Sequence, residues 1–130
     1  MKLLTRILII FGILIAVIAV GVFVLYNNMQ KTASTYNKFD FASLDLSNVQ
    51  DGTYTGSEDG GIVKASVEVT VKDHVITNVK ILSHECGKGK PAEVIVNDIV
   101  NNNSLEVDTV SGATYSSNVI KVAVYNALTQ

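Results

Sequence analysis

The sequence has no tryptophan and contains one cysteine, one proline and two histidines among its 130 residues. The single cysteine, Cys86, has no partner within the chain, which excludes a disulfide-stapled scaffold. A hydroxyl nucleophile needs a neighbouring base. We expect His74 in a hairpin turn and His84 at a strand end, so no catalytic triad can be assembled, and no paired acids or metal-ligand clusters occur. These absences argue against a hydrolytic enzyme or a metalloenzyme.

Arginine is almost absent as well, since Arg6 is the only one. Beyond residue 26 the chain carries eight lysines and twelve acidic residues, and no stretch of it is a basic stripe. Nucleic-acid-binding domains concentrate positive charge on one face. This mildly acidic segment therefore has no nucleic-acid partner.

The one long hydrophobic run, Ile7 to Tyr26, contains no charged residue. A helix of that length spans roughly 30 Å, the thickness of a bilayer core. A cleaved signal peptide has a shorter run of about 7 to 15 residues and a small-residue cleavage site directly after it, whereas "NNMQK" follows here. A buried hairpin helix is the other alternative. We predict an uncleaved, single-pass anchor in membrane lipid.

The orientation of this anchor depends on a small charge bias. Lys2 and Arg6 precede the apolar run, and Lys31 and Lys38 follow it. Only positive charges count in the inside-positive rule. The short leader with its early charges favours a cytoplasmic amino terminus, so we expect a protein of the cell membrane with its soluble domain outside the cytoplasm.

The chain divides by composition into three parts. We assign 1–26 to the membrane anchor, 27–45 to a polar tether, and 46–130 to a domain of a size that can fold alone. Within the domain a short strand is expected near Tyr54, and a strand with alternating apolar residues begins at Ile62. A hairpin over an Asp-His turn leads to a third strand, Val75 to Ser83.

Two helices follow these strands. Pro91 suits the first turn of a helix that ends in an asparagine run. The final segment has helical spacing up to Leu128, with Ser116 or Ser117 as its expected N-cap. An antiparallel sheet covered by two helices gives an α+β fold behind an N-terminal transmembrane helix.

The stretch "DTVSGATYSS", 108–117, crowds hydroxyl side chains around a Gly-Ala pair directly before the last helix. The helix start offers unpaired amides and a positive dipole end, which favour a phosphate. Ser, Thr and Gly before a helix are also ordinary turn and capping residues. Spacing alone leaves both readings open.

This stretch, with "DGTYTG" (51–56) and "HECGKGKPA" (84–92), resembles the FMN-binding domain family, which includes subunits of the sodium-pumping quinone reductase and of the Rnf complex. The resemblance covers roughly 49–128. In that family a flavin transferase splits FAD and joins FMN through its phosphate to a threonine. The resemblance implies that Thr114 is the acceptor and that the recognition sequence comprises Asp108, Ser111, Gly112 and Ala113.

The glycine-rich loop is a second candidate for contact with FMN. Gly87 and Gly89 would let the backbone approach the cofactor, and His84, Lys88 and Lys90 could hydrogen-bond it. Loop flexibility for the glycines and solvated charges for the lysines are the favoured explanations. "GKGKP" is not a phosphate-binding P-loop.

The resemblance implies an electron-carrying flavoprotein rather than an enzyme, with FMN as its cofactor. Its partners would be a flavin transferase that uses FAD, redox donor and acceptor proteins, or a quinone-linked membrane complex. A pilin-like structural subunit and a sensor with non-covalent FMN are the alternatives. The apolar run lacks the early glutamate and the processing site of a pilin.

Overall fold

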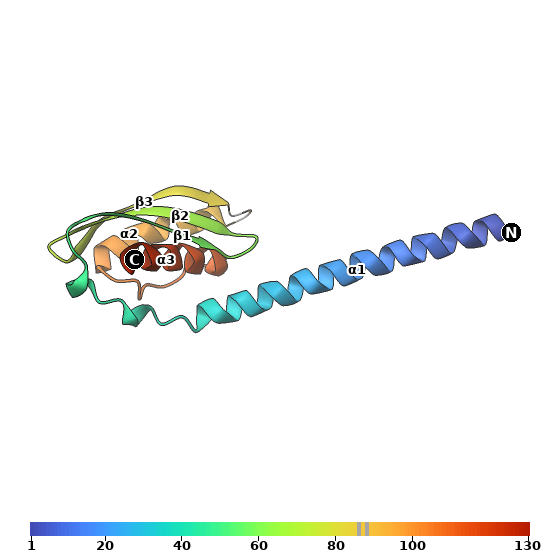
Figure 1. Ribbon diagram of the computed structural model, residues 1–130, viewed down its shortest axis with the longest axis horizontal. Coiled ribbons are helices and arrows are strands. Elements are labelled where there is room, and N and C mark those ends of the chain that lie inside the picture. Colours follow the sequence, from blue (N-terminus) through green and yellow to red (C-terminus); the bar gives the residue numbers. More distant parts are fainter. Residues whose placement is uncertain (86, 88) are drawn as a thin grey trace. The chain divides into compact units, whose positions relative to one another are not determined.

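The computed structural model describes residues 1–85, 87 and 89–130 (Figure 1). Cys86 and Lys88 lie outside the described residues, and so does any role predicted for them. The chain forms two compact units, Met1–Ser34 and Thr35–Gln130.

The helix α1 covers Lys2–Asn37 and contains the apolar run. It is long and apolar enough to cross a membrane. The side chains of its apolar run are exposed and do not pack against other described parts of the protein. The helix continues past Tyr26, so part of the segment expected as a tether is helical. The division into anchor, tether and domain stays a prediction.

The end of that segment packs on the second unit. Two short 3₁₀ turns, η1 (Phe41–Ser43) and η2 (Leu46–Asn48), are capped by the Asp40 and Asp45 carboxylates. Phe41 and Leu46 lie partly buried against the hydrophobic core. These turns thus belong to the second compact unit, which begins at Thr35.

A three-stranded antiparallel sheet, in the order β1-β2-β3, forms the centre of that domain. The strands are β1 (Gly52–Asp59), β2 (Lys64–Lys72) and β3 (Val75–Glu85). The alternation read from the sequence is confirmed, because every second residue of β2 is buried on one face: Ala65, Val67, Val69 and Val71.

The turn between β2 and β3 is the expected Asp-His hairpin. Asp73 and His74 both have positive φ, 52° and 63°, as a two-residue type I′ turn requires. The Asp73 amide donates to the Asp51 carboxylate at 2.7 Å. The His74 Nδ1 atom lies 3.1 Å from the carbonyl oxygens of Leu46 and Val49, so this histidine has a structural role.

Two α-helices cover the buried face of the sheet (Figure 1). Pro91 lies in a 3₁₀ turn, η3 (Lys90–Val94), that leads into α2 (Ile95–Asn102). Helix α3 (Thr114–Leu128) packs on β1 and β2, while α2 packs on β3. The predicted α+β architecture is confirmed.

Helix α3 touches the sheet most closely at Gly56. A Cβ atom at this position would lie 2.3 Å from the Ala123 carbonyl oxygen and 2.4 Å from the Ala127 nitrogen. Both are backbone atoms and cannot rotate away. The absent side chain therefore sets the distance between helix and strand.

We predict that Gly56→Ala lowers the free energy of unfolding by at least about 2 kcal/mol, because overpacking forces the backbone apart. Thermal or urea unfolding of the full chain in detergent, followed by circular dichroism, measures the change. Thr55→Ala, one residue away and exposed, is the control and should change stability by less than about 1 kcal/mol. Equal losses in both variants would contradict the close-packing argument.

Candidate functional site: the loop before helix α3

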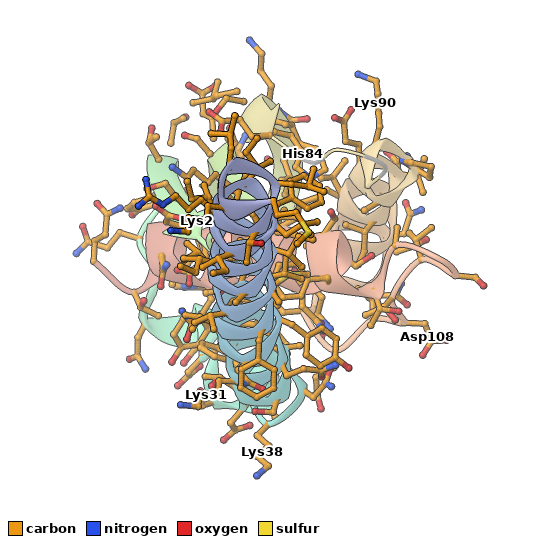
Figure 2. The ribbon with its side chains drawn as sticks, turned by 90° about the vertical axis from the view of Figure 1, so that its right-hand side faces the viewer. Lys2, Lys31, Lys38, His84, Lys90 and Asp108 are labelled. Carbon is orange, nitrogen blue, oxygen red and sulfur yellow. The ribbon has the colours of Figure 1, made fainter. Side chains whose placement is uncertain are left out.

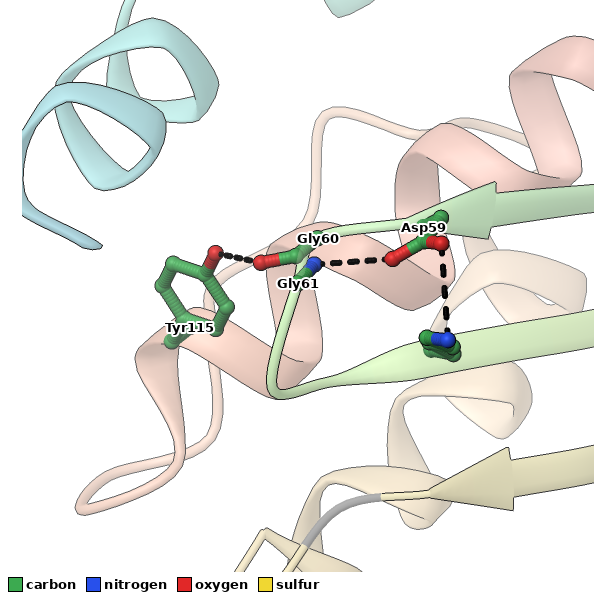
Figure 3. A network of polar contacts seen from close by, with 5 residues as sticks. Asp59, Gly60, Gly61 and Tyr115 are labelled. Carbon is green, nitrogen blue, oxygen red and sulfur yellow. Dashed lines mark hydrogen bonds and ion pairs between the residues drawn. The ribbon is translucent and has the colours of Figure 1, made fainter. Parts of the chain in front are cut away.

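A contact with the β1–β2 turn places the start of α3 at one end of the sheet. Tyr115, in the first turn of α3, donates its hydroxyl proton to the Gly60 carbonyl in the β1–β2 turn (Figure 3). In the same turn the Asp59 carboxylate accepts from the Gly61 amide at 2.9 Å and lies 3.5 Å from the Lys64 Nζ atom. The first turn of α3 therefore lies beside the β1–β2 turn.

The loop 108–113 before α3 is a tight turn held by backbone and side-chain hydrogen bonds. The Ala113 amide donates to the Val110 carbonyl at 2.9 Å, and Gly112 between them has φ +76°. A positive φ at the third position is what a type II turn requires, and glycine adopts it without strain. Gly112 thus serves the turn that precedes the helix.

Ser117 joins the loop to the helix. Its Oγ atom accepts the Val110 amide at 3.0 Å and donates to the Ala113 carbonyl at 2.8 Å. The side chain is completely buried. One hydroxyl therefore fixes both ends of the turn against the first turn of α3.

The expectation that Ser116 or Ser117 is the N-cap was wrong. Helix α3 begins at Thr114, with Ala113 in the N-cap position and no capping side chain. Ser117 bonds backward to the carbonyl four residues earlier, as serine often does inside helices. Among the described residues no side chain caps the start of α3, where the positive end of the helix dipole lies.

The predicted recognition residues lie on this turn. Asp108, Ser111, Gly112 and Thr114 are exposed, while Ala113 is buried. Within the part of the chain that the structure describes, the Thr114 hydroxyl makes no hydrogen bond. It is the first residue of the helix and remains open to a modifying enzyme.

His84 lies at the same end of the sheet, because it pairs across the strands with Ala65 of β2, close to the β1–β2 turn. The His84 side chain is only 1% exposed, and its Nδ1 atom lies 3.1 Å from the Glu93 carboxylate. Its Nε2 atom is buried and has no hydrogen-bond partner among the described residues.

The other candidates in the glycine-rich loop differ in how exposed they are. Gly87 is exposed with φ +50°, whereas Gly89 is buried and immediately precedes η3. The Lys90 side chain is 81% exposed and extends into solvent, as Figure 2 shows, with its Nζ atom 3.8 Å from Glu93. Lys90 is thus a solvated charge.

No sequence pattern predicted a role for Lys121, which lies near the loop 108–113. It belongs to α3 and is 5% exposed. Its Nζ atom donates to the Val107 carbonyl at 3.0 Å and lies 4.1 Å from the centre of the Phe41 ring. Burial lowers the pKa of Lys121, and the nearby Asp108 and Glu106 carboxylates oppose that shift. The ammonium group holds the segment that leads into the loop 108–113.

A depression of about 320 Å³ adjoins the loop and exposes three carboxylates. Among the described residues no group of acids, histidines or cysteines could hold a metal ion. The residues that line the depression are Asp98, Asn102, Glu106, Val107 and Asp108. In Figure 2 the Asp108 side chain points away from the ribbon.

Comparison with known families matches residues 60–129, more than half of the chain, to the FMN-binding domain. The chain therefore belongs to the FMN-binding domain family, and FMN is its cofactor. No curated protein and no solved structure matches the chain significantly. The matched range includes the loop 108–113 and the glycine-rich loop but not "DGTYTG" at 51–56.

The geometry fits the phosphate of this cofactor. The uncapped amides at the start of α3 suit an anion, and the exposed Thr114 hydroxyl lies at the same point. The roles predicted for individual residues in holding FMN stay predictions.

We predict that Ser117→Ala lowers the free energy of unfolding by about 1 to 3 kcal/mol, because the Val110 amide loses its acceptor. Chemical denaturation of the full chain in detergent measures this. Ser116→Ala is the matched control, since Ser116 is 3% exposed and makes no side-chain hydrogen bond within the described ranges. If both serines proved equally tolerant, Ser117 would not hold the loop.

A pH-dependent prediction concerns Lys121. Its pKa in the folded protein is lower than the ordinary value of 10.5, so the unfolded chain binds the proton more readily. The stability of the protein relative to Lys121→Met should be highest above pH 10.5 and fall as pH falls through the lowered pKa. Paired unfolding curves from neutral to alkaline pH measure this difference, in which other titrating groups cancel. A difference that stayed flat or fell with rising pH would contradict it.

Proposed function

We propose that this protein is a membrane-anchored, extracytoplasmic flavoprotein that carries FMN on Thr114 and uses it for electron transfer. One observation carries the proposal: Thr114 is exposed at the first position of α3, where no side chain of the described residues caps the helix start. A hydroxyl and an anion-binding helix end thus coincide within a domain that binds FMN.

The attachment would proceed by phosphoryl transfer from FAD. The Thr114 oxygen attacks the phosphorus of the FMN half, a new P–O bond forms, and the anhydride bond of FAD breaks. AMP leaves, and a base of the enzyme takes the threonine proton. No described side chain contacts the Thr114 hydroxyl as a base would, which is why we assign activation to a separate flavin transferase.

The chain's own part is to present the acceptor. The type II turn and the Ser117 hydroxyl hold the loop in one shape. Ser111 and Gly112 are exposed beside Thr114, so an enzyme can read them together. After transfer, the uncapped amides of the first turn would face the new phosphodiester, which retains one negative charge.

When bound, FMN supplies the redox chemistry, accepting and passing on electrons. The rest of the chain would fix the cofactor in a domain held at the membrane, within reach of redox proteins or of a quinone-linked complex. The long apolar helix α1 supports a membrane location. The charge bias around it favours an extracytoplasmic domain.

The first test is flavin fluorescence of the denatured protein band after expression with and without a flavin transferase. We expect fluorescence only with the transferase, because only a covalent flavin survives denaturation. Thr114→Ala should abolish the signal while keeping the fold, and Thr109→Ala in the same loop should retain it. Thr114→Ser should retain a reduced signal, since it keeps a hydroxyl at the same position.

The alternatives predict other results. A sensor with non-covalent FMN would bind flavin in its native state and lose it in the gel. A pilin-like subunit would be found in sheared filaments, and membership in the FMN-binding family does not support it. A fluorescent Thr114→Ala band would show that another residue carries the flavin.

A further inference from the structure

His84 is a buried polar side chain with one half of its hydrogen-bonding capacity unused. The side chain is 1% exposed, and Nδ1 lies 3.1 Å from the Glu93 Oε1 atom. Its Nε2 atom is buried and has no partner among the residues that the structure describes. Buried polar groups are nearly always paired, so an unpaired one indicates a missing partner.

The contact with Glu93 determines whether the partner of Nε2 must be a hydrogen-bond donor or an acceptor. An ionised carboxylate only accepts hydrogen bonds, so the proton of a neutral imidazole lies on Nδ1. The Nε2 atom is then an acceptor and requires a donor. Glu93 acts as the positioning residue that holds the ring in this orientation.

The location of His84 connects it with the cofactor. His84 pairs with Ala65 near the start of β2, and the β1–β2 turn holds Tyr115 of α3 through Gly60. Glu93 belongs to η3, which also packs against α3. The start of α3 and the His84 imidazole therefore lie at the same end of the sheet.

We propose that the Nε2 atom of His84 accepts a hydrogen bond from an N–H group on the isoalloxazine ring of FMN. This rests on the proposed attachment at Thr114 for the position of the cofactor. The ring carries an imide N–H that matches a lone imidazole acceptor. Because Nε2 is buried, the ring must displace the groups that now cover it. His84 thereby fixes the ring while the start of α3 holds the phosphate.

The test is nitrogen NMR of ¹⁵N-labelled histidine in the full chain, with and without FMN. The chain has two histidines, and His74, bonded to backbone carbonyls in the distant hairpin turn, is the internal control. His84→Gln and His74→Gln assign the signals. We expect FMN to shift the Nε2 resonance of His84 and to leave those of His74 unchanged.

Two forms of FMN keep this inference separate from the covalent attachment. One sample is loaded by a flavin transferase and checked by gel fluorescence, and the other is Thr114→Ala with excess free FMN. A His84 shift with free FMN alone would support the histidine contact and contradict covalent loading. A fluorescent, loaded protein with an unchanged His84 signal would overturn the contact and leave the proposed function standing. No shift with either form also overturns it.

Affinity gives an independent readout. His84→Gln should weaken the binding of free FMN to the Thr114→Ala protein by about five- to tenfold, the equivalent of one hydrogen bond. His74→Gln should leave it within about twofold. The visible absorption band of the bound flavin should change with His84→Gln alone, which a purely structural effect would not produce. Equal affinities and spectra in the two variants would contradict the proposal.

Discussion

The close packing of α3 on β1 and β2 is the constraint on which the site depends. Gly56 allows the helix backbone to lie almost in contact with the strand, and Tyr115 attaches the first helical turn to Gly60. With the helix axis fixed in this way, its first residue can lie only at the end of the sheet beside the β1–β2 turn. Thr114 is placed there by the core, although it is itself exposed.

The polar contacts around the loop refine this placement. The buried Ser117 hydroxyl hydrogen-bonds the Val110 amide and the Ala113 carbonyl at the two ends of the turn. Lys121 donates to the Val107 carbonyl in the preceding segment. The Phe41 ring over the ammonium group comes from the region directly after α1. The segment directly after α1 and the segment that leads into the loop 108–113 therefore contact the same buried lysine.

Much of this fold could be predicted because its patterns are local. The alternation of Val67 and Val69 with polar residues identified β2 and its buried face, and family resemblance drew attention to Thr114. The helix start was predicted three or four residues late, because a serine before a helix and a serine in its first turn look alike in sequence. Only the three-dimensional contact of Ser117 with Val110 separates the two cases.

Lys121 and Glu93 escaped prediction for another reason. Helix α3 is buried on nearly all sides, so its lysine interrupts no simple apolar stripe. The pairing of Glu93 with His84 joins a 3₁₀ turn to a strand end, and no spacing rule relates them. Such tertiary contacts between short elements leave no periodic signal in a single sequence.

Peptide mass spectrometry of the full chain, purified from cells that express a flavin transferase, tests the central claim most directly. The account predicts one modified peptide, increased by the mass of FMN less water, with fragmentation placing the group on Thr114. An unmodified peptide over 108–117 from a protein that nevertheless binds FMN, or a modification at another residue, would contradict it.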